Sequence, residues 1–213
     1  PRAAAPGWSR PMSFRRGPVG LIRFRVEASP SVGPRILDGV SRRRFAPLDQ
    51  ESGETDRSAG WVSVLDDGGV VRGASVFFRG DALLGWRIDQ VRVPAALVRE
   101  RLERWVREFE LREGRRPAKP LRAEQKELIV RDLRKQAFVI SRIHGLRWRV
   151  EARELQVWAT SARVVDEMVV AAEEDLGLRL ARMGPGPRWT AAGWPTDGLA
   201  PTAALFGEAV LDG

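Results

Sequence analysis

The densest group of side chains able to do chemistry in this sequence is a short basic stretch near the middle of the chain. Between residues 112 and 122, a single acid, Glu113, accompanies five cations: Arg112, Arg115, Arg116, Lys119 and Arg122. Arginine and lysine bind phosphate through charge-assisted hydrogen bonds, and each such contact with DNA releases condensed counterions. Arg115, Arg116, Lys119 and Arg122 are therefore candidate DNA-binding residues. The structural alternative is a solvated helical hairpin with surplus charge.

Two further pairs of arginines occur in segments with the alternating pattern of β-strands. Arg23 and Arg25 alternate with apolar residues in the segment 18–27, and Arg147 and Arg149 do so in the segment 138–150. Because successive side chains of a strand point to opposite faces, we expect these arginines on the face turned away from the core. They are weaker candidates for phosphate binding than the basic stretch.

Residue types suited to catalysis are sparse. His144 is the only histidine and there is no cysteine, so histidine-based and thiolate zinc sites are excluded. Asp66-Asp67 and Glu124-Gln125-Lys126 could suggest a Mg²⁺-dependent nuclease, but the first pair occupies an expected turn and the second an exposed helical face. No phosphate-binding loop of the GxxxxGK[ST] type is present. We therefore expect no catalytic residues, no metal and no cofactor.

The basic stretch should join two amphipathic helices. Pro94 suits the first position of a helix, apolar residues then recur at helical spacing from Val98 to Phe109, and Gly114 is a typical terminator. A second helix should begin near Pro120, with an inner face formed by Leu121, Leu128, Ile129 and Leu133.

The remaining pattern predicts an α+β fold. Strands are expected over residues 18–27, 70–78, 83–93, 138–150, 155–159 and 178–183, and shorter helices over 34–43 and from Ser161 to Gly177. This order predicts antiparallel sheet structure, on which the amphipathic helical pair and one further helix pack.

Composition limits the class of protein. The chain has 213 residues, of which 43% are hydrophobic and 30% charged, with a net charge of +8. No apolar run approaches the roughly 20 residues needed to span a bilayer, so we expect a cytoplasmic protein without a membrane partner. We divide the chain into an irregular or expression-derived segment (1–17), an α+β domain (18–183) whose helical pair (94–137) forms a protruding subdomain, and a Pro/Gly-rich tail (184–213).

The order of several markers resembles the recombination-associated protein RdgC family. The similar features are Phe45 followed by an acidic loop and Gly60-Trp61-Val62, the segments 91–98 and 108–119, Ala137-Phe138, Trp148, and the closing segment 176–178. They span residues 18–183, and their order and spacing are more specific than any one of them. The short C-terminal region would make this chain a truncated member.

The resemblance implies a non-enzymatic protein that binds duplex DNA with little sequence preference. It further implies a homodimer that forms a ring around DNA, an association with the nucleoid, and a modulating role in homologous recombination, where a recombination protein is a possible partner. Phe138 matches a family phenylalanine at a subunit contact. Gln136 stands where the family has an arginine.

Two rival functions remain open at this point. One is a protein-interaction module that keeps an RdgC-like core but has lost DNA encirclement, with the acidic segment 46–69 or the tail docking a partner. The other is a metal-dependent nuclease that uses Asp66 or Glu124. DNA binding through arginine and lysine contacts with phosphate is the leading hypothesis.

Overall fold

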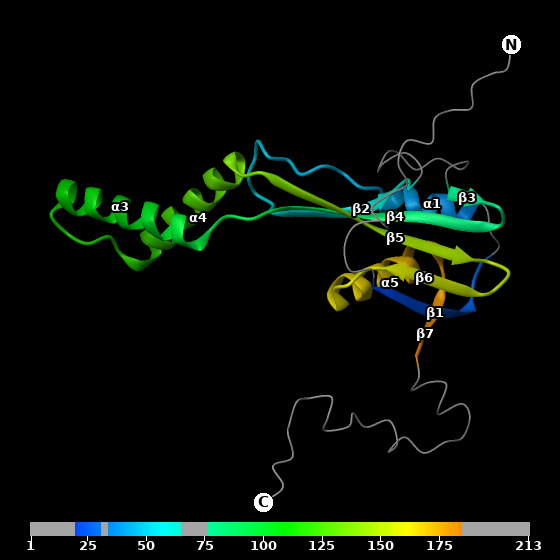
Figure 1. The fold of residues 1–213 in the computed structure, drawn as a ribbon. Helices are drawn as coiled ribbons and strands as arrows, with labels where there is room; N and C mark the ends of the chain where they lie inside the picture. Colours follow the sequence, from blue (N-terminus) through cyan, green and yellow to red (C-terminus); the bar gives the residue numbers. More distant parts are fainter. Residues whose placement is uncertain (1–19, 31–33, 65–75, 185–213) are drawn as a thin grey trace, which may run out of the picture.

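A computed structural model describes residues 20–30, 34–64 and 76–184 of the chain. Within these ranges the chain forms a body and a projecting helical hairpin (Figure 1). The body is a seven-stranded antiparallel sheet that carries helices α1 (Pro34–Arg42) and α5 (Ala162–Leu176), and the hairpin consists of α3 (Ala95–Glu113) and α4 (Lys119–Gln136). The predicted α+β fold is confirmed.

The sheet has the order β2-β4-β5-β6-β1-β7, with β3 paired to β4. The strands are β1 (Leu21–Ala28), β2 (Arg57–Val62), β3 (Phe77–Phe78), β4 (Asp81–Val91), β5 (Val139–Arg149), β6 (Glu154–Trp158) and β7 (Arg179–Met183). β4 and β5 pair along their whole length, from Asp81↔Arg149 to Val91↔Val139. β6 pairs only with the last part of β5, from Gly145 onward, so the first half of β5 pairs only with β4. We call this projecting part of β4 and β5, with β2 along the other edge of β4, the stem.

The main core lies between one face of the sheet and the two helices α1 and α5. Alternate strand residues such as Phe24, Leu84 and Leu155 are buried against apolar residues of the helices. Trp61 and Trp86 meet edge to face in this core, with ring centroids 4.7 Å apart. Burial of large side chains on this face forces the intervening residues of each strand onto the opposite face.

A buried polar contact joins three elements of the body. The carboxylate of Asp175, near the end of α5, accepts a hydrogen bond of 2.8 Å from the indole N–H of Trp61 in β2. It also forms an ion pair of 3.2 Å with Arg43, directly after α1. Gly39 of α1 lies against the backbone of Asp175, so the two helices touch with no side chain between them.

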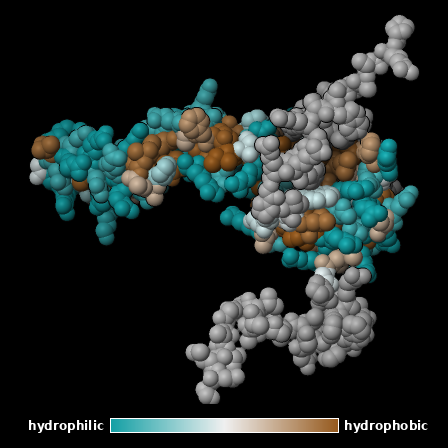
Figure 2. Space-filling model, viewed as in Figure 1, coloured by the Kyte–Doolittle hydropathy of each residue, from teal (hydrophilic) through white to brown (hydrophobic). Residues whose placement is uncertain are grey.

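The hairpin has a small core of its own. Val98 of α3 is buried against Ile129 and Leu133 of α4, and partly buried apolar residues from both helices surround them. Figure 2 shows apolar residues gathered along the half of the hairpin nearest the body, while its far end is mostly hydrophilic. Leu121 and Leu128 are 37% and 46% exposed. Their predicted place on the inner face is wrong, because α3 covers only a narrow stripe of α4.

An acidic segment braces the hairpin against the stem. Glu54 forms a 2.6 Å ion pair with Arg131 of α4, and Arg134 donates to the carbonyl of Glu54 and reaches the carboxylate of Asp56 at 3.4 Å. The backbone N–H of Val91 donates to the carbonyl of Asp56. These contacts hold residues 54–56 between the last part of α4 and the end of β4.

Most predicted elements are confirmed with small shifts at their ends. Gly114 and Gly177 both adopt the left-handed conformation that ends a helix, as predicted for α3 and α5. Ser161 is the N-cap residue of α5, although its side chain makes no capping hydrogen bond. The predicted strand 70–78 lies largely outside the described residues, as do the N-terminal segment 1–17 and nearly all of the tail. Among the described helices, none is long and apolar enough to cross a membrane.

Candidate nucleic-acid interface

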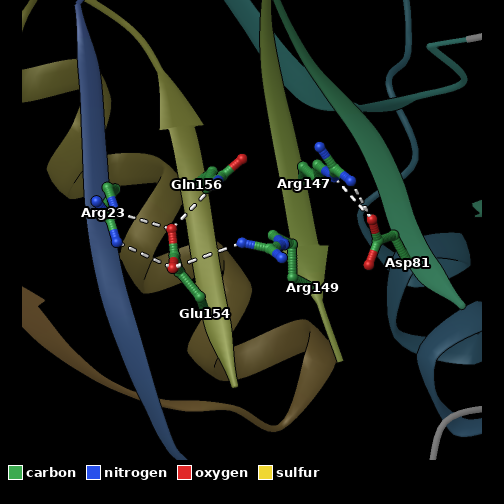
Figure 3. A network of polar contacts seen from close by, with 6 residues as sticks. All are labelled: Arg23, Asp81, Arg147, Arg149, Glu154 and Gln156. Carbon is green, nitrogen blue, oxygen red and sulfur yellow. Dashed lines mark hydrogen bonds and ion pairs between the residues drawn. The ribbon is translucent and has the colours of Figure 1, made fainter. Parts of the chain in front are cut away.

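The four arginines expected on strands lie together on one face of the sheet. Arg23 and Arg25 come from β1 and Arg147 and Arg149 from β5, with β6 between them. In the register of the sheet, Gln156 of β6 lies opposite both Arg23 and Arg147, and Glu154 lies opposite both Arg25 and Arg149. We call this set the sheet-face arginines. It occupies the face turned away from α1 and α5, as the strand pattern predicts (Figure 3).

Glu154 is the centre of charge in this group. Arg23 binds both of its carboxylate oxygens, at 2.8 Å and 3.1 Å, and Gln156 donates to it at 2.9 Å. Arg149 lies 4.0 Å away on the other side. The hydrogen bond from Gln156 lowers the pKa of Glu154, the contacts with Arg23 and the charge of Arg149 lower it further, and burial opposes them. Glu154 is therefore ionised at neutral pH; it holds Arg23 in place through two hydrogen bonds and attracts Arg149.

A second carboxylate fixes Arg147. The side chain of Asp81, at the start of β4, accepts from Nε of Arg147 at 2.8 Å and also from its Nη2. Arg25 forms no hydrogen bond or ion pair with the described part of the chain. Within this group, four arginines are accompanied by two carboxylates, so the group carries a net positive charge. The side chains of Arg23, Arg147 and Arg149 are 50%, 42% and 43% exposed, so they remain accessible to a ligand.

The four candidate DNA-binding cations of the central basic stretch lie at the far end of the hairpin, away from the sheet (Figure 1). All four are exposed, and we call Arg115, Arg116, Lys119 and Arg122 the hairpin cations. Arg116 forms a 2.9 Å ion pair with Glu110, whereas the other three have no such partner among the described residues. α4 has no acid in its first turn, so the positive end of its dipole adds to their charge.

The two groups of cations do not form one continuous surface. The sheet-face arginines belong to the body, and the hairpin cations lie beyond the stem and the length of α3 and α4. A ligand that contacts both must be long, as a duplex is, or the groups must serve different contacts. Sequence spacing could not reveal this separation because it depends on how far the stem projects.

Phe138, the candidate subunit contact, is 91% exposed at the junction between α4 and β5. Ile140, two residues further along, is 47% exposed. A phenylalanine with so much of its surface in water has the character of an interface anchor, since interface cores are enriched in aromatic residues. Gln136 is exposed at the end of α4.

The residues considered for metal-dependent chemistry do not converge in the described structure. Glu124 is exposed on α4, and Asp66 and Asp67 lie outside the described ranges. Those ranges contain no group of three or more histidine, aspartate or glutamate side chains placed to hold a metal ion.

Sequence reasoning missed the carboxylates that organise the sheet-face arginines. Glu154 comes from β6 and Asp81 from β4, and no local pattern signals either contact. The alternation of β6 could have placed Glu154 on the arginine-bearing face, but its register with β5 and β1 requires the folded sheet.

A family model described as "RdgC: Putative exonuclease, RdgC" matches residues 21–208. The match includes every described strand and helix from β1 to β7 and continues past residue 183, where the resemblance found in the sequence ends. No curated protein matches the chain.

Proposed function

The chain belongs to the RdgC family, and on that premise we propose that it is a non-enzymatic protein that binds duplex DNA without sequence preference. The observation that carries the proposal is the group of sheet-face arginines, preorganised by Glu154 and Asp81 on one side of the sheet. Side chains held in place lose little conformational entropy when they bind a ligand. The exposed hairpin cations supply a second contact with the DNA backbone.

Lack of sequence preference follows from the kind of contact proposed. Phosphate contacts position a protein on DNA but carry no sequence information, which is read at base edges in the grooves. The sheet-face arginines lie on interior strands, each paired with a neighbour on both edges. Such a broad surface supports contact with the phosphates on the outside of a duplex. We therefore expect similar affinities for unrelated duplexes.

The decisive test is a salt titration of duplex binding. For nonspecific phosphate binding, the logarithm of the affinity should fall linearly with the logarithm of salt concentration, with a slope of about −0.9 for each phosphate contacted. Undetectable binding at low salt would overturn the proposal. Binding that persists unchanged at high salt would indicate a different type of contact.

The printed description of the family also names an exonuclease activity, so the same preparation should be assayed for it. We expect end-labelled duplex and single-stranded DNA to remain intact in the presence of Mg²⁺ or Mn²⁺. Metal-stimulated cleavage that is abolished by Glu124→Gln or Asp66→Asn would contradict the non-enzymatic part of the proposal.

In the cell, we propose that the protein associates with the nucleoid and modulates homologous recombination as a homodimer. The family membership supports the recombination role, and the exposure of Phe138 supports a subunit contact. A test is the effect of the protein on recombinase-driven strand exchange between homologous duplexes, which we expect to slow in proportion to DNA coverage. A partner pull-down that survives nuclease treatment, without any duplex binding, would favour the interaction module instead.

A further inference from the structure

A pocket of about 310 Å³ lies on the side of the sheet opposite the sheet-face arginines. It is formed where the stem of β4 and β5 leaves the body and meets the first turn of α5 (Figure 1). Side chains from β2, β4, β5, the link between β4 and α3, and α5 line it. We call it the stem pocket.

The charges that line the stem pocket are mostly positive. Arg57, Arg92, Arg142 and Arg163 contribute to its wall, and Glu167 is the one acid there. Arg57 is neutralised by Glu167, at 2.5 Å. Arg92, Arg142 and Arg163 have no hydrogen bond or ion pair in the described part of the chain, and all three are exposed.

The lack of carboxylate partners for Arg92, Arg142 and Arg163 distinguishes the stem pocket from the sheet-face arginines. On the sheet face, three of the four arginines already contact a carboxylate. In the stem pocket, three arginines from three different parts of the chain line one space, and the one carboxylate there, Glu167, is paired with Arg57. Like charges brought together in this way repel each other, and a bound anion would relieve the repulsion. The partial positive charge at the start of α5 adds a smaller contribution.

His144 also lines the pocket and is half-buried there. Burial lowers the pKa of His144, and the charge of Arg142 lowers it further, while a hydrogen bond to the backbone of Trp158 and the charge of Glu167 act in the other direction. An anion bound among the arginines would oppose the effect of Arg142. The imidazole is thus a built-in reporter of occupancy, and its signal is unambiguous because the chain has one histidine.

We propose that the stem pocket binds a phosphate group through Arg92, Arg142 and Arg163. Guanidinium groups form paired hydrogen bonds with phosphate oxygens, and the wall of the pocket offers them from several directions. That the phosphate belongs to a DNA backbone rests on the proposed function. Because a straight duplex cannot touch both faces of one sheet, the stem pocket and the sheet-face arginines must then contact different stretches of DNA.

The pocket itself is tested by following the ring signals of His144 by NMR in the full chain. Inorganic phosphate is added at constant ionic strength, with chloride as the compensating anion. We expect a saturable shift and a rise in the pKa of His144. In the variant Arg142→Gln/Arg163→Gln, half-saturation should need at least about tenfold more phosphate, the scale of one lost charged hydrogen bond.

A matched control removes the same charge elsewhere. Arg179→Gln/Arg182→Gln changes two arginines of β7, which β6 and β1 separate from β5, and should leave the phosphate response unchanged. Thermal unfolding of each variant checks that it is folded. A linear, non-saturable response, or equal responses in both double variants, would overturn the pocket.

Duplex DNA then tests the source of the phosphate. If the backbone occupies the stem pocket, Arg142→Gln/Arg163→Gln should make the salt dependence of binding shallower by roughly 1 to 2, against about 0.9 for each phosphate contact, and more than the control does. DNA binding with identical slopes in both variants would overturn the DNA assignment while the proposed function stands. A saturable phosphate response without any duplex binding would support the pocket and overturn the proposed function.

Discussion

At the scale of single residues, the charge of the arginine-bearing sheet face depends on Glu154. This carboxylate orients Arg23 and attracts Arg149, and it also cancels part of the charge that a polyanion would meet. The strand pattern predicted which face the arginines occupy. It could not predict their partners, because Glu154 and Asp81 reach them across strands whose register is set by the packing of the whole sheet.

The substitution Glu154→Gln should have opposite effects on stability and on DNA binding. Loss of the carboxylate removes charged hydrogen bonds at a half-exposed arginine, so unfolding free energy at neutral pH should fall by about 1–2 kcal/mol. Duplex affinity should rise, because the positive charge that Arg23 and Arg149 regain outweighs the preorganisation that Glu154 gives them. Urea unfolding and fluorescence anisotropy measure the two effects. Glu151→Gln, at an exposed position, is the control, and equal affinities in the two variants would count against DNA contact at this face.

The contribution of Glu154 to the free energy of unfolding should depend on pH. Since the pKa of Glu154 is lowered in the folded protein from the ordinary value of 4.5, its contribution to stability is present above that value and is lost as the pH falls through the folded-state pKa. The stability difference between the wild type and Glu154→Gln should therefore shrink as the pH is lowered below 4.5. A difference that stays constant into that range would mean that the pKa of Glu154 is not lowered by folding.

At the scale of elements, local sequence signals were sufficient to predict where most helices and strands begin and end. Pro34 and Gly177 lie where helices begin and end, and β4 and β5 are displaced from their predicted positions by at most two residues. The inner face of α4 was harder, because Leu121 and Leu128 have helical spacing yet remain exposed. Periodicity shows which residues share a face of a helix, but the area that a neighbour covers depends on how closely the two helices approach.

Gly39→Ala tests the contact between α1 and α5. Helix propensity alone would make this change favourable by roughly 0.5–1 kcal/mol. A Cβ at this position, however, would overlap the backbone oxygen of Asp175, so the helices would have to separate. We expect a net destabilisation of about 1–3 kcal/mol, as for other overpacked cores, measured by chemical unfolding.

Ser41→Ala, at an exposed position of the same helix, controls for propensity and should be neutral or slightly stabilising. A stabilising effect of Gly39→Ala would show that α1 does not approach α5 so closely.

At the scale of the whole molecule, the hairpin separates the two groups of cations that the sequence offers as DNA-binding candidates. Its projection also exposes Phe138 where the hairpin joins the body. Neither fact follows from local patterns, because both depend on the length of the stem and on the brace formed by Glu54 and Asp56.

If Phe138 forms the proposed subunit contact, Phe138→Ser should weaken self-association without destabilising the monomer. A side chain that is 91% exposed contributes little to the core of its own chain. Sedimentation equilibrium should show a dimer for the wild type and a dissociation constant at least about tenfold higher for the variant, in line with an interface anchor. Leu111→Ser, 87% exposed on the last turn of α3, is the matched control. A monomeric wild type would contradict the prediction.

The pairing of Val91 with Val139 has a consequence for how the chain is built. Everything between these two residues is an insertion into an otherwise continuous β-hairpin, because the strands on either side stay in register. Residues 92–138 could therefore be replaced by a two-residue Asn-Gly turn, the connection that antiparallel strands favour. The entropic cost of bringing β4 and β5 together would fall, because this cost grows with the logarithm of the length of the connecting loop. We therefore expect the shortened chain to fold faster than the parent in stopped-flow refolding.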